Sequence, residues 1–495
     1  MRIKYNRETE LYEAHIDGFP AGVNKYDDIV RPGQATDAQN LFLDGSKRGG
    51  SAKVNASAIG ASAILGLAPY YKVGTSSKWL MAKHGTVAYR WTGTAWESVK
   101  TGLTTAYEME FQPFNALAYA VDGKDGYFQY DGTTFAAVTP VVATADEIAA
   151  VGDNVLKVGS GINNDWQFIF LLDNYLMVGG SSDHPSRVYF TYIDEATLEL
   201  KPGYIPAKHR VDFRTNDNEG LIAGLTYGGD GILFKESSLF RLLGSTRLDF
   251  RPYRVEGAKG TPARRSPAIV KHLLFYLTKD EGVYGFDGNT PTKILSDLDT
   301  VFDSINQTYI AKSCATEWDG KYLLAIPEGT DTVNKTVIVY DPKYQGYAIL
   351  RYPFGITAFC KYKFSDTEVL CAAGADGIVY KLFTTDTDDA GTTIDAYVEF
   401  TVGLENTEFA KRPIKSFPTC DGKIDNLSVI CTVGATTYTD SAIGTGTVTI
   451  PTKYKTDPFG AAKGSFFKIK VRHNGDGAFR LTKLLTQFTM DDVPK

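Results

Sequence analysis

Cysteine, histidine and long apolar runs are all scarce in this chain of 495 residues. The five cysteines are scattered and none forms a CxxC pair, so we expect buried thiols in a protein made in a reducing compartment. The six histidines show neither an HExxH motif nor a close pair, and their spacing therefore does not support a zinc site. These residues are Cys314, Cys360, Cys371, Cys420 and Cys431, and His15, His84, His184, His209, His272 and His473.

The chain also lacks an apolar signal core and a strong charge of either sign. Its first residues, MRIKYNRETE, contain no such core, and the mild apolar run around 58–68 is far shorter than a membrane span. The formal net charge is −6, which argues against a nucleic-acid binder whose affinity comes from neutralising phosphates. We therefore expect a globular protein that is made in the cytoplasm and has no membrane-spanning segment.

Glycine and aromatic residues are abundant, with aromatics at 13% of the chain. They gather in a repeated stretch whose clearest copy, 272–288, reads HLLFYLTKDEGVYGFDG. An apolar strand at 273–277, a polar turn at 278–282 and an aromatic strand at 283–286 precede an Asp287-Gly288 turn. The first strand is nearly all apolar, which predicts that both of its faces are covered.

Seven copies of this hairpin occur along the chain at irregular spacing. Their average spacing is close to the roughly 40–50 residues of a four-stranded propeller blade. One copy cannot bury its own faces, whereas radial stacking of several copies would. The pattern predicts an all-β protein built on a β-propeller of about seven blades. The copies are 78–91, 116–130, 175–191, 231–243, 272–288, 321–340 and 369–382.

Changes in residue composition and in the strand pattern divide the chain into four parts. Residues 1–50 are predicted to be an N-terminal closing segment that ties the ring, with a short helix over 35–41 capped by Thr36. Residues 51–385 are the propeller, and the polar stretch 386–393 is a linker. Residues 394–495 show alternating strands and predict a C-terminal β-sandwich-like domain, whose early strands are an alternative means of closing the ring.

Three kinds of segment break the pattern. Residues 141–165 are either a blade insertion or a loop that contacts a partner. The acidic run Asp386, Asp388 and Asp389 lacks the distal glutamate of a calcium loop. Two basic runs are either solvated faces or electrostatic contacts with a neighbouring subunit or DNA. The basic runs are Lys201, Lys208, His209, Arg210 and Arg214, and Arg251, Arg254, Lys259, Arg264 and Arg265.

Motifs of catalysis are missing: the sequence has no nucleophile elbow, no Walker loop and no dinucleotide-binding fingerprint. The matched turns 91–96 and 130–135 invite comparison with the Asp-x-Gly-x-Thr-Trp repeat of sialidases. However, Asp131 is followed directly by Gly132, and Thr92 stands where the other copy has Asp131. We therefore assign no catalytic, cofactor-binding or metal-ligating residue, and we expect neither a cofactor nor enzymatic activity.

Several segments together resemble the β-propeller structural proteins of tailed bacteriophages, known as the tail hub, nozzle or stabilisation proteins of short-tailed phages. The resemblance extends over most of the chain as patterned residues rather than as one invariant motif, and 141–165 has no counterpart in it. The segments that carry it are 22–24 with 38–41, 44–45 and 48–49, then 221–244, 257–288 and 466–488.

The resemblance implies a virion structural protein without enzymatic activity, made in the host cytoplasm and located in the phage tail. Proteins of this family form a ring, commonly of six copies, below the portal and adaptor proteins. They line the channel through which DNA leaves without specific binding, and they can carry tail fibres. An acidic chain suits such a wall, because like charge keeps DNA from adhering.

Two other functions stay open at this point. The chain would serve as a receptor- or glycan-binding phage protein if Trp91, Trp96 and Trp166 stack on sugars, although aromatic turns that pack the blades explain these residues more simply. It would be a propeller glycosidase if innermost strands gathered three carboxylates on the axis. Neither role has a motif in its favour.

Overall fold

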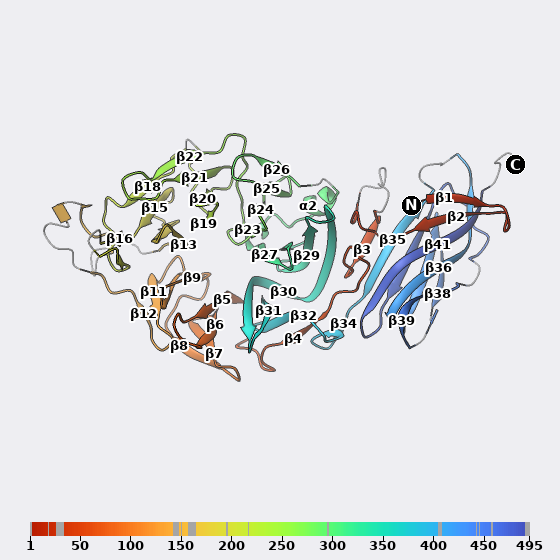
Figure 1. Ribbon diagram of the computed structural model, residues 1–495, viewed down its shortest axis with the longest axis horizontal. Helices are drawn as coiled ribbons and strands as arrows, with labels where there is room; N and C mark the ends of the chain where they lie inside the picture. Colours follow the sequence, from red (N-terminus) through yellow and green to blue (C-terminus); the bar gives the residue numbers. More distant parts are fainter. Residues whose placement is uncertain are drawn as a thin grey trace.

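The computed structural model describes residues 2–17, 19–25, 34–141, 148–149, 151–156, 165–194, 197–215, 217–294, 297–403, 408–441, 443–444, 446–456 and 459–490. Two bodies lie side by side along its longest axis, and Figure 1 shows them as a ring of blades and a β-sandwich that carries both chain ends. None of the helices in this described part has the length and apolar character of a membrane span.

The ring is a β-propeller of seven blades. Blade 1 contains β5 (Ile64–Tyr71), β6 (Lys78–His84), β7 (Val87–Trp91) and β8 (Trp96–Lys100). Blade 2 contains β9 (Glu110–Phe114), β10 (Leu117–Val121), β11 (Tyr127–Tyr130) and β12 (Phe135–Ala137). Blade 3 contains β13 (Phe168–Leu172), β14 (Tyr175–Gly179), β15 (Arg187–Phe190) and β18 (Arg210–Asp212), with β16 (Tyr192–Ile193) and β17 (Leu200–Lys201) paired beside it.

Blades 4 and 5 follow the same antiparallel order. Blade 4 contains β19 (Ala223–Tyr227), β20 (Asp230–Phe234), β21 (Leu239–Leu243) and β22 (Arg251–Arg254). Blade 5 contains β23 (Ala268–Val270), β24 (Leu273–Leu277), β25 (Val283–Phe286) and β26 (Pro291–Lys293), and is followed by α2 (Asp299–Asp303) and η1 (Ile310–Lys312). The outermost strands β22 and β26 include Pro252 and Pro291, which cannot donate a ladder hydrogen bond and so discourage edge pairing.

Blades 6 and 7 share one long strand, and the N-terminal part of the chain completes the ring. In blade 6, β27 (Cys314–Trp318), β28 (Lys321–Ile326) and β29 (Asn334–Asp341) pair with the first half of β30 (Gly346–Phe364). The second half of β30 starts blade 7 with β31 (Thr367–Gly374) and β32 (Val379–Thr384). The fourth strand of blade 7 is β4 (Gly50–Lys53), antiparallel to β32.

Each predicted hairpin is the second and third strand of one blade, so the propeller prediction and its blade count are confirmed. The second strands are buried along most of their length on both faces, as their apolar sequences require. In blades 2 to 7 the first and second strands are joined by two-residue turns whose first residue has a positive φ. Those residues are Asn115, Asp173, Gly228, Lys271, Asp319 and Ser365.

The second body is a sandwich of two five-stranded sheets. One sheet has the order β1 (Arg2–Asn6), β2 (Leu11–Ile16), β41 (Phe479–Met490), β36 (Lys411–Lys423) and β39 (Thr447–Lys453). The other has the order β3 (Asp37–Gln39), β35 (Ala396–Val402), β40 (Phe467–His473), β37 (Leu427–Val433) and β38 (Thr436–Ser441).

The structure corrects the sequence-based description of the N-terminal 50 residues. Only their end, with β4, closes the ring, whereas β1, β2 and β3 are strands of the sandwich. The edge of β41 would otherwise be open, and β2 covers it while burying Ala14 and Ile16. The helix expected over 35–41 is the strand β3, because pairing with β35 outweighs the weak local preference.

The expected linker 386–393 also has structure of its own. It contains β33 (Asp388–Asp389) and β34 (Thr392–Thr393), which pair with each other, and β33 also pairs with β4. One hydrophobic core runs without a break from blades 5–7 into the sandwich. It includes Leu350 and Tyr347 of β30 together with Val398 of β35. The propeller and the sandwich are therefore packed as one unit.

A buried arginine fastens the junction of the two bodies. The Arg48 side chain is fully buried, and its two terminal nitrogens donate to Asp389 at 2.8 and 2.5 Å. Its Nε donates to Asn40 Oδ1 at 3.0 Å, and its guanidinium lies 4.1 Å from the ring centre of Tyr352. Ser51 donates a further hydrogen bond to Asp389 at 2.8 Å. The segment before β4, the β33 hairpin and β30 are thus joined around one ion pair.

His473 makes the sandwich sensitive to acid. Its ring is fully buried and stacks on Phe479 at 4.6 Å, and burial with nearby Lys47 lowers its pKa from 6.5 to about 4. Between these pH values the unfolded chain binds more protons than the folded one, so stability falls as the pH drops from 6.5 towards 4. The loss from this group amounts to at most about 3 kcal/mol.

We expect His473→Gln to flatten the dependence of unfolding free energy on pH in that window, measured by urea titration at several pH values. His184→Gln is the matched control, because His184 is exposed. An equal pH dependence in the His473 variant and the wild type would show that other groups cause the acid sensitivity.

Candidate functional site

The propeller axis is occupied by an arginine–glutamate network. Arg264 and Arg265 precede β23, whereas Glu108 and Glu110 lie just before and at the start of β9. Arg264 pairs with Glu108 at 2.8 Å and with Glu110 at 2.9 Å, and it donates to the carbonyl oxygen of Gln167 at 2.7 Å. Arg265 donates to the carbonyl oxygens of Leu65 and Met109 at 2.9 and 3.1 Å. The two arginines therefore tie together the inner strands of blades on different sides of the ring.

Both axial carboxylates are paired with arginine, in contrast to a free catalytic pair. Burial raises the pKa of Glu108, but Arg265 and Arg264 outweigh it and hold that pKa below its usual range. At Glu110 burial prevails and raises the pKa. The hollow beside them has a volume of about 240 Å³ and includes Cys314 in its wall. This network suits a structural plug better than an acid and a nucleophile that must stay open to substrate.

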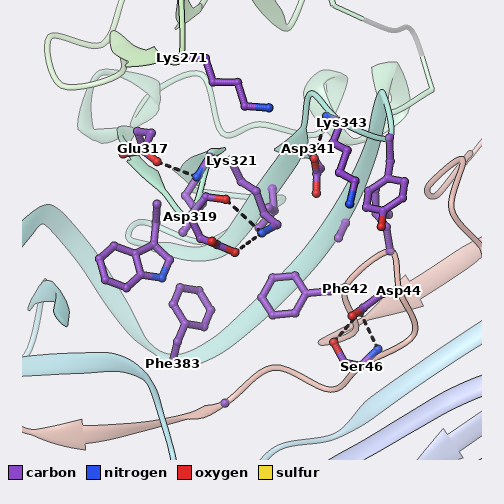
Figure 2. Close-up of a pocket in the computed structure, with 18 of the residues that line it drawn as sticks. Phe42, Asp44, Ser46, Lys271, Glu317, Asp319, Lys321, Asp341, Lys343 and Phe383 are labelled. Atoms are coloured by element: carbon purple, nitrogen blue, oxygen red, sulfur yellow. Dashed lines mark hydrogen bonds and ion pairs between the residues drawn. The ribbon is translucent and has the colours of Figure 1, made fainter. Parts of the chain in front are cut away.

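A larger groove lies where the propeller meets the chain that leads from the sandwich to β4. We call it the junction groove; its volume is about 990 Å³. Figure 2 shows that side chains from separate elements face into it, including Lys271 of blade 5, Lys321 of blade 6 and Phe42 of the 40–49 connection. Its wall also includes Asp44, Glu317, Trp318, Asp319, Asp341, Lys343, Tyr344, Lys361 and Phe383.

The polar wall of the junction groove consists largely of ion pairs. Asp319 pairs with Lys321 at 2.5 Å across the β27–β28 turn, and Glu317 pairs with Lys361. The backbone N–H of Gly320 also donates to Glu317 at 2.7 Å. Burial raises the pKa of Glu317, but the contacts with Lys361 and Gly320 outweigh it and leave that pKa lowered. Within the described chain, Lys271 has no carboxylate within ion-pair distance.

Aromatic rings form the apolar part of the wall. Phe42 and Phe383 are in contact at 5.8 Å between ring centres, and both are partly exposed, as is Trp318. Tyr344 is 38% exposed, and Lys343 lies over its ring at 4.9 Å. The groove therefore presents partly exposed aromatic faces next to paired charges.

Two residues of this wall have backbone conformations that their side chains disfavour. Phe383 has φ 55° at an irregularity in the pairing of β32 with β4, and Lys271 has φ 56° in the turn of blade 5. The equivalent turns of blades 2, 3, 4, 6 and 7 begin with asparagine, aspartate, glycine or serine. A left-handed conformation is unusual for residues as large as lysine or phenylalanine, and such strain clusters at functional sites.

The residues singled out from the sequence do not form one site. Trp91 and Trp166 are buried, and Trp96 packs on Trp91 with 5.4 Å between the ring centres. These indoles therefore contribute to packing within the blades. Asp389 is engaged by Arg48, and the described residues contain no cluster of three or more metal ligands. All five cysteines are buried free thiols, as expected. Much of the 141–165 loop falls outside the described residues.

The two basic runs are separated by the fold. His209 is buried and stacks on Phe190 at 4.6 Å, while Lys201 and Arg214 pair with Asp194 and Asp212. In the second run, Arg264 and Arg265 lie on the axis, whereas Lys259 pairs with Glu281. Lys208, Arg210, Arg251 and Arg254 are exposed on blades 3 and 4.

Comparison with known proteins gives a distant likeness in fold. No protein-family model matches the chain, and no curated protein matches it. Among solved structures, YCF48 bound to a D1 peptide has a TM-score of 0.42 at 9% identity over 70% of this chain and 97% of that one. The computationally designed Ika8 protein scores 0.40 at 11% identity, over 67% and 99% of the two chains. BBS1N in complex with ARL6DN scores 0.41 at 11% identity, over 69% and 97%. At such scores these likenesses have no bearing on function.

Proposed function

We propose that this chain is a structural subunit of a phage tail, in the hub or nozzle ring through which DNA is ejected. The observation that supports it most is the core that runs unbroken from the propeller into the sandwich. A subunit built in this way transmits load without a hinge between its bodies, which is what a wall under ejection pressure requires. The net charge of −6 is compatible with DNA passing along that wall without adhering.

The segments that resemble phage tail proteins coincide with these structural positions. Residues 40, 44–45 and 48–49 lie at the junction, 257–288 include the axial arginines and blade 5, and 466–488 include β40 and most of β41. Because Arg264 and Arg265 occupy the propeller axis, DNA would not pass through a single subunit. The conduit would be enclosed by a ring of copies with heterologous, closing contacts.

Electron microscopy of the purified full-length protein, with and without the adaptor complex of the same phage, tests this proposal. We expect closed rings with a central channel, commonly of six copies, or subunits that dock in a ring on the adaptor. Each contact should bury at least several hundred Å² per partner. Single discs that never engage the adaptor would contradict the proposal.

A further inference from the structure

The junction groove has the shape and chemistry of a saccharide site, and we propose that it binds a linear glycan. Its volume of about 990 Å³ is at the upper end of the range for small-ligand sites. A second hollow of about 510 Å³ between blades 4 and 5 shares Lys271 with it and continues past His272 to Tyr227. Two neighbouring hollows that share Lys271 as a wall residue favour an elongated ligand over a compact one.

The rings of the groove supply flat apolar surface at its wall. Trp318, Phe42 and Phe383 are partly exposed, and Tyr344 is exposed next to them. Aromatic rings combine a large apolar face with polar surroundings, and this matches the C–H faces of a pyranose ring that carries hydroxyls at its rim. In contrast, Trp91 and Trp166, two of the three tryptophans first considered for sugar stacking, are buried within the blades, and the third, Trp96, packs on Trp91.

The paired charges favour hydroxyl groups over charged ligands. A hydroxyl donates one hydrogen bond and accepts others, so it can bind the carboxylate and the ammonium of one ion pair at the same time. The pairs Asp319–Lys321 and Glu317–Lys361 present this combination. A charged group placed at either of these two pairs would have to displace one partner and leave the other uncompensated.

The backbone of the wall argues against an extended peptide as the ligand. A peptide that binds by adding a strand needs unpaired N–H and C=O groups. Here the N–H of Gly320 donates to Glu317, that of Lys343 to Asp341 and that of Ser46 to Asp44. Recognition would therefore rely on side chains, as it does for a sugar.

The strained residues give an independent reason to place a ligand here. Lys271 and Phe383 each hold a left-handed backbone, which is strained for side chains of this size. Lys271 gains no ion pair in the described chain from this conformation. These backbone conformations instead place the ammonium group of Lys271 and the ring of Phe383 in the wall of the groove.

The test is binding of the full-length protein to an array of linear oligosaccharides built from hexoses, N-acetylhexosamines and uronic acids, followed by calorimetry with the strongest hit. Tyr344→Ala and Phe383→Gly should each weaken binding about tenfold. Lys271→Asn should also weaken it while keeping the turn, because asparagine accepts a positive φ. This variant guards against a loss caused by misfolding, since we expect its melting temperature to equal or exceed that of the wild type.

Two control variants should bind the glycan as the wild type does. Tyr253→Ala removes a tyrosine that is 52% exposed on the outer strand of blade 4, and Ser365→Asn changes the equivalent turn of blade 7. An array without a glycan hit would overturn the proposal. So would a glycan that all three groove variants bind as tightly as the wild type, or capture from a matched peptide array in place of glycans.

Discussion

Replacing Arg48 by methionine should lower the free energy of unfolding by about 3–5 kcal/mol, because it leaves the buried Asp389 carboxylate without its partner. The side chains of Arg48 and Asp389 are 0% and 3% exposed, so water cannot take over the lost contacts. Three further hydrogen bonds of the guanidinium, to Asn40, Gly49 and Arg351, are lost with it. Methionine fills much of the volume, so the loss is electrostatic rather than a cavity effect.

Urea denaturation followed by tryptophan fluorescence and by circular dichroism measures this loss. Arg351→Met is the matched control: Arg351 pairs with Glu328 at 2.8 Å, but its side chain is 43% exposed, and we expect a cost below about 1 kcal/mol. Adding Asp389→Asn to Arg48→Met should recover part of the loss, because the double variant no longer buries an unpaired charge. Equal costs for the Arg48 and Arg351 variants would mean that the buried pair does not fasten the junction.

Much of the propeller could be predicted because each blade repeats a local signal. The second strand of a blade is covered on both faces and therefore reads as a short apolar run, such as 273–277 or 322–326. The turn after the third strand is set by an aspartate: Asp131 and Asp287 each accept backbone N–H bonds from the residues two and three positions later. These hydrogen bonds lower the pKa of both aspartates. Such signals need no knowledge of distant contacts.

The pairing between strands from the two ends of the chain could not be predicted, because it depends on contacts between residues that are far apart in the sequence. Strands β2 and β41 pair Tyr12 with Phe488 and Ile16 with Leu484, across almost the whole sequence. A strand of six residues shows that it needs a partner but not which one. The strand β3 is shorter still and resembled a helix turn, until its pairing with β35 decided its conformation.

In the junction groove and at the propeller axis, too, local features could be predicted from the sequence and long-range contacts could not. The Asp319-Gly320 turn in the junction groove has a recognisable hairpin sequence, since both residues adopt positive φ. The approach of Phe42 to Phe383 depends on how the N-terminal connection crosses blade 7, and no local pattern encodes it. Arg264 and Arg265 were visible as a basic run, yet their carboxylate partners lie more than 150 positions earlier, in blade 2. Charge runs identify the residues involved but not their partners.

Replacing Arg264 by methionine is expected to have the other large effect on stability, about 3–5 kcal/mol at neutral pH. The change leaves Glu108 and Glu110, which are 29% and 20% exposed, facing each other with one arginine fewer. Two carboxylates that share a poorly hydrated site repel, and both burial and repulsion raise their pKa. Arg241→Met is the control, because Arg241 pairs with one carboxylate, Asp230, and its side chain is 26% exposed against 16% for Arg264, so we expect a cost below about 1 kcal/mol.

The pH dependence separates this electrostatic loss from a packing defect. In the Arg264 variant the folded-state pKa of the carboxylates lies above the unfolded value, so the folded chain binds more protons and its stability rises as the pH falls from about 7 to 5. The wild type should show a smaller gain, because Arg264 and Arg265 hold the pKa of Glu108 below its usual range and only the pKa of Glu110 is raised. We expect urea midpoints of the variant to recover over this range, although the acid sensitivity of His473 opposes the recovery in both proteins. The difference between variant and wild type is therefore the quantity to measure: a difference that stays constant with pH would mean that Arg264 supports the axis by packing alone.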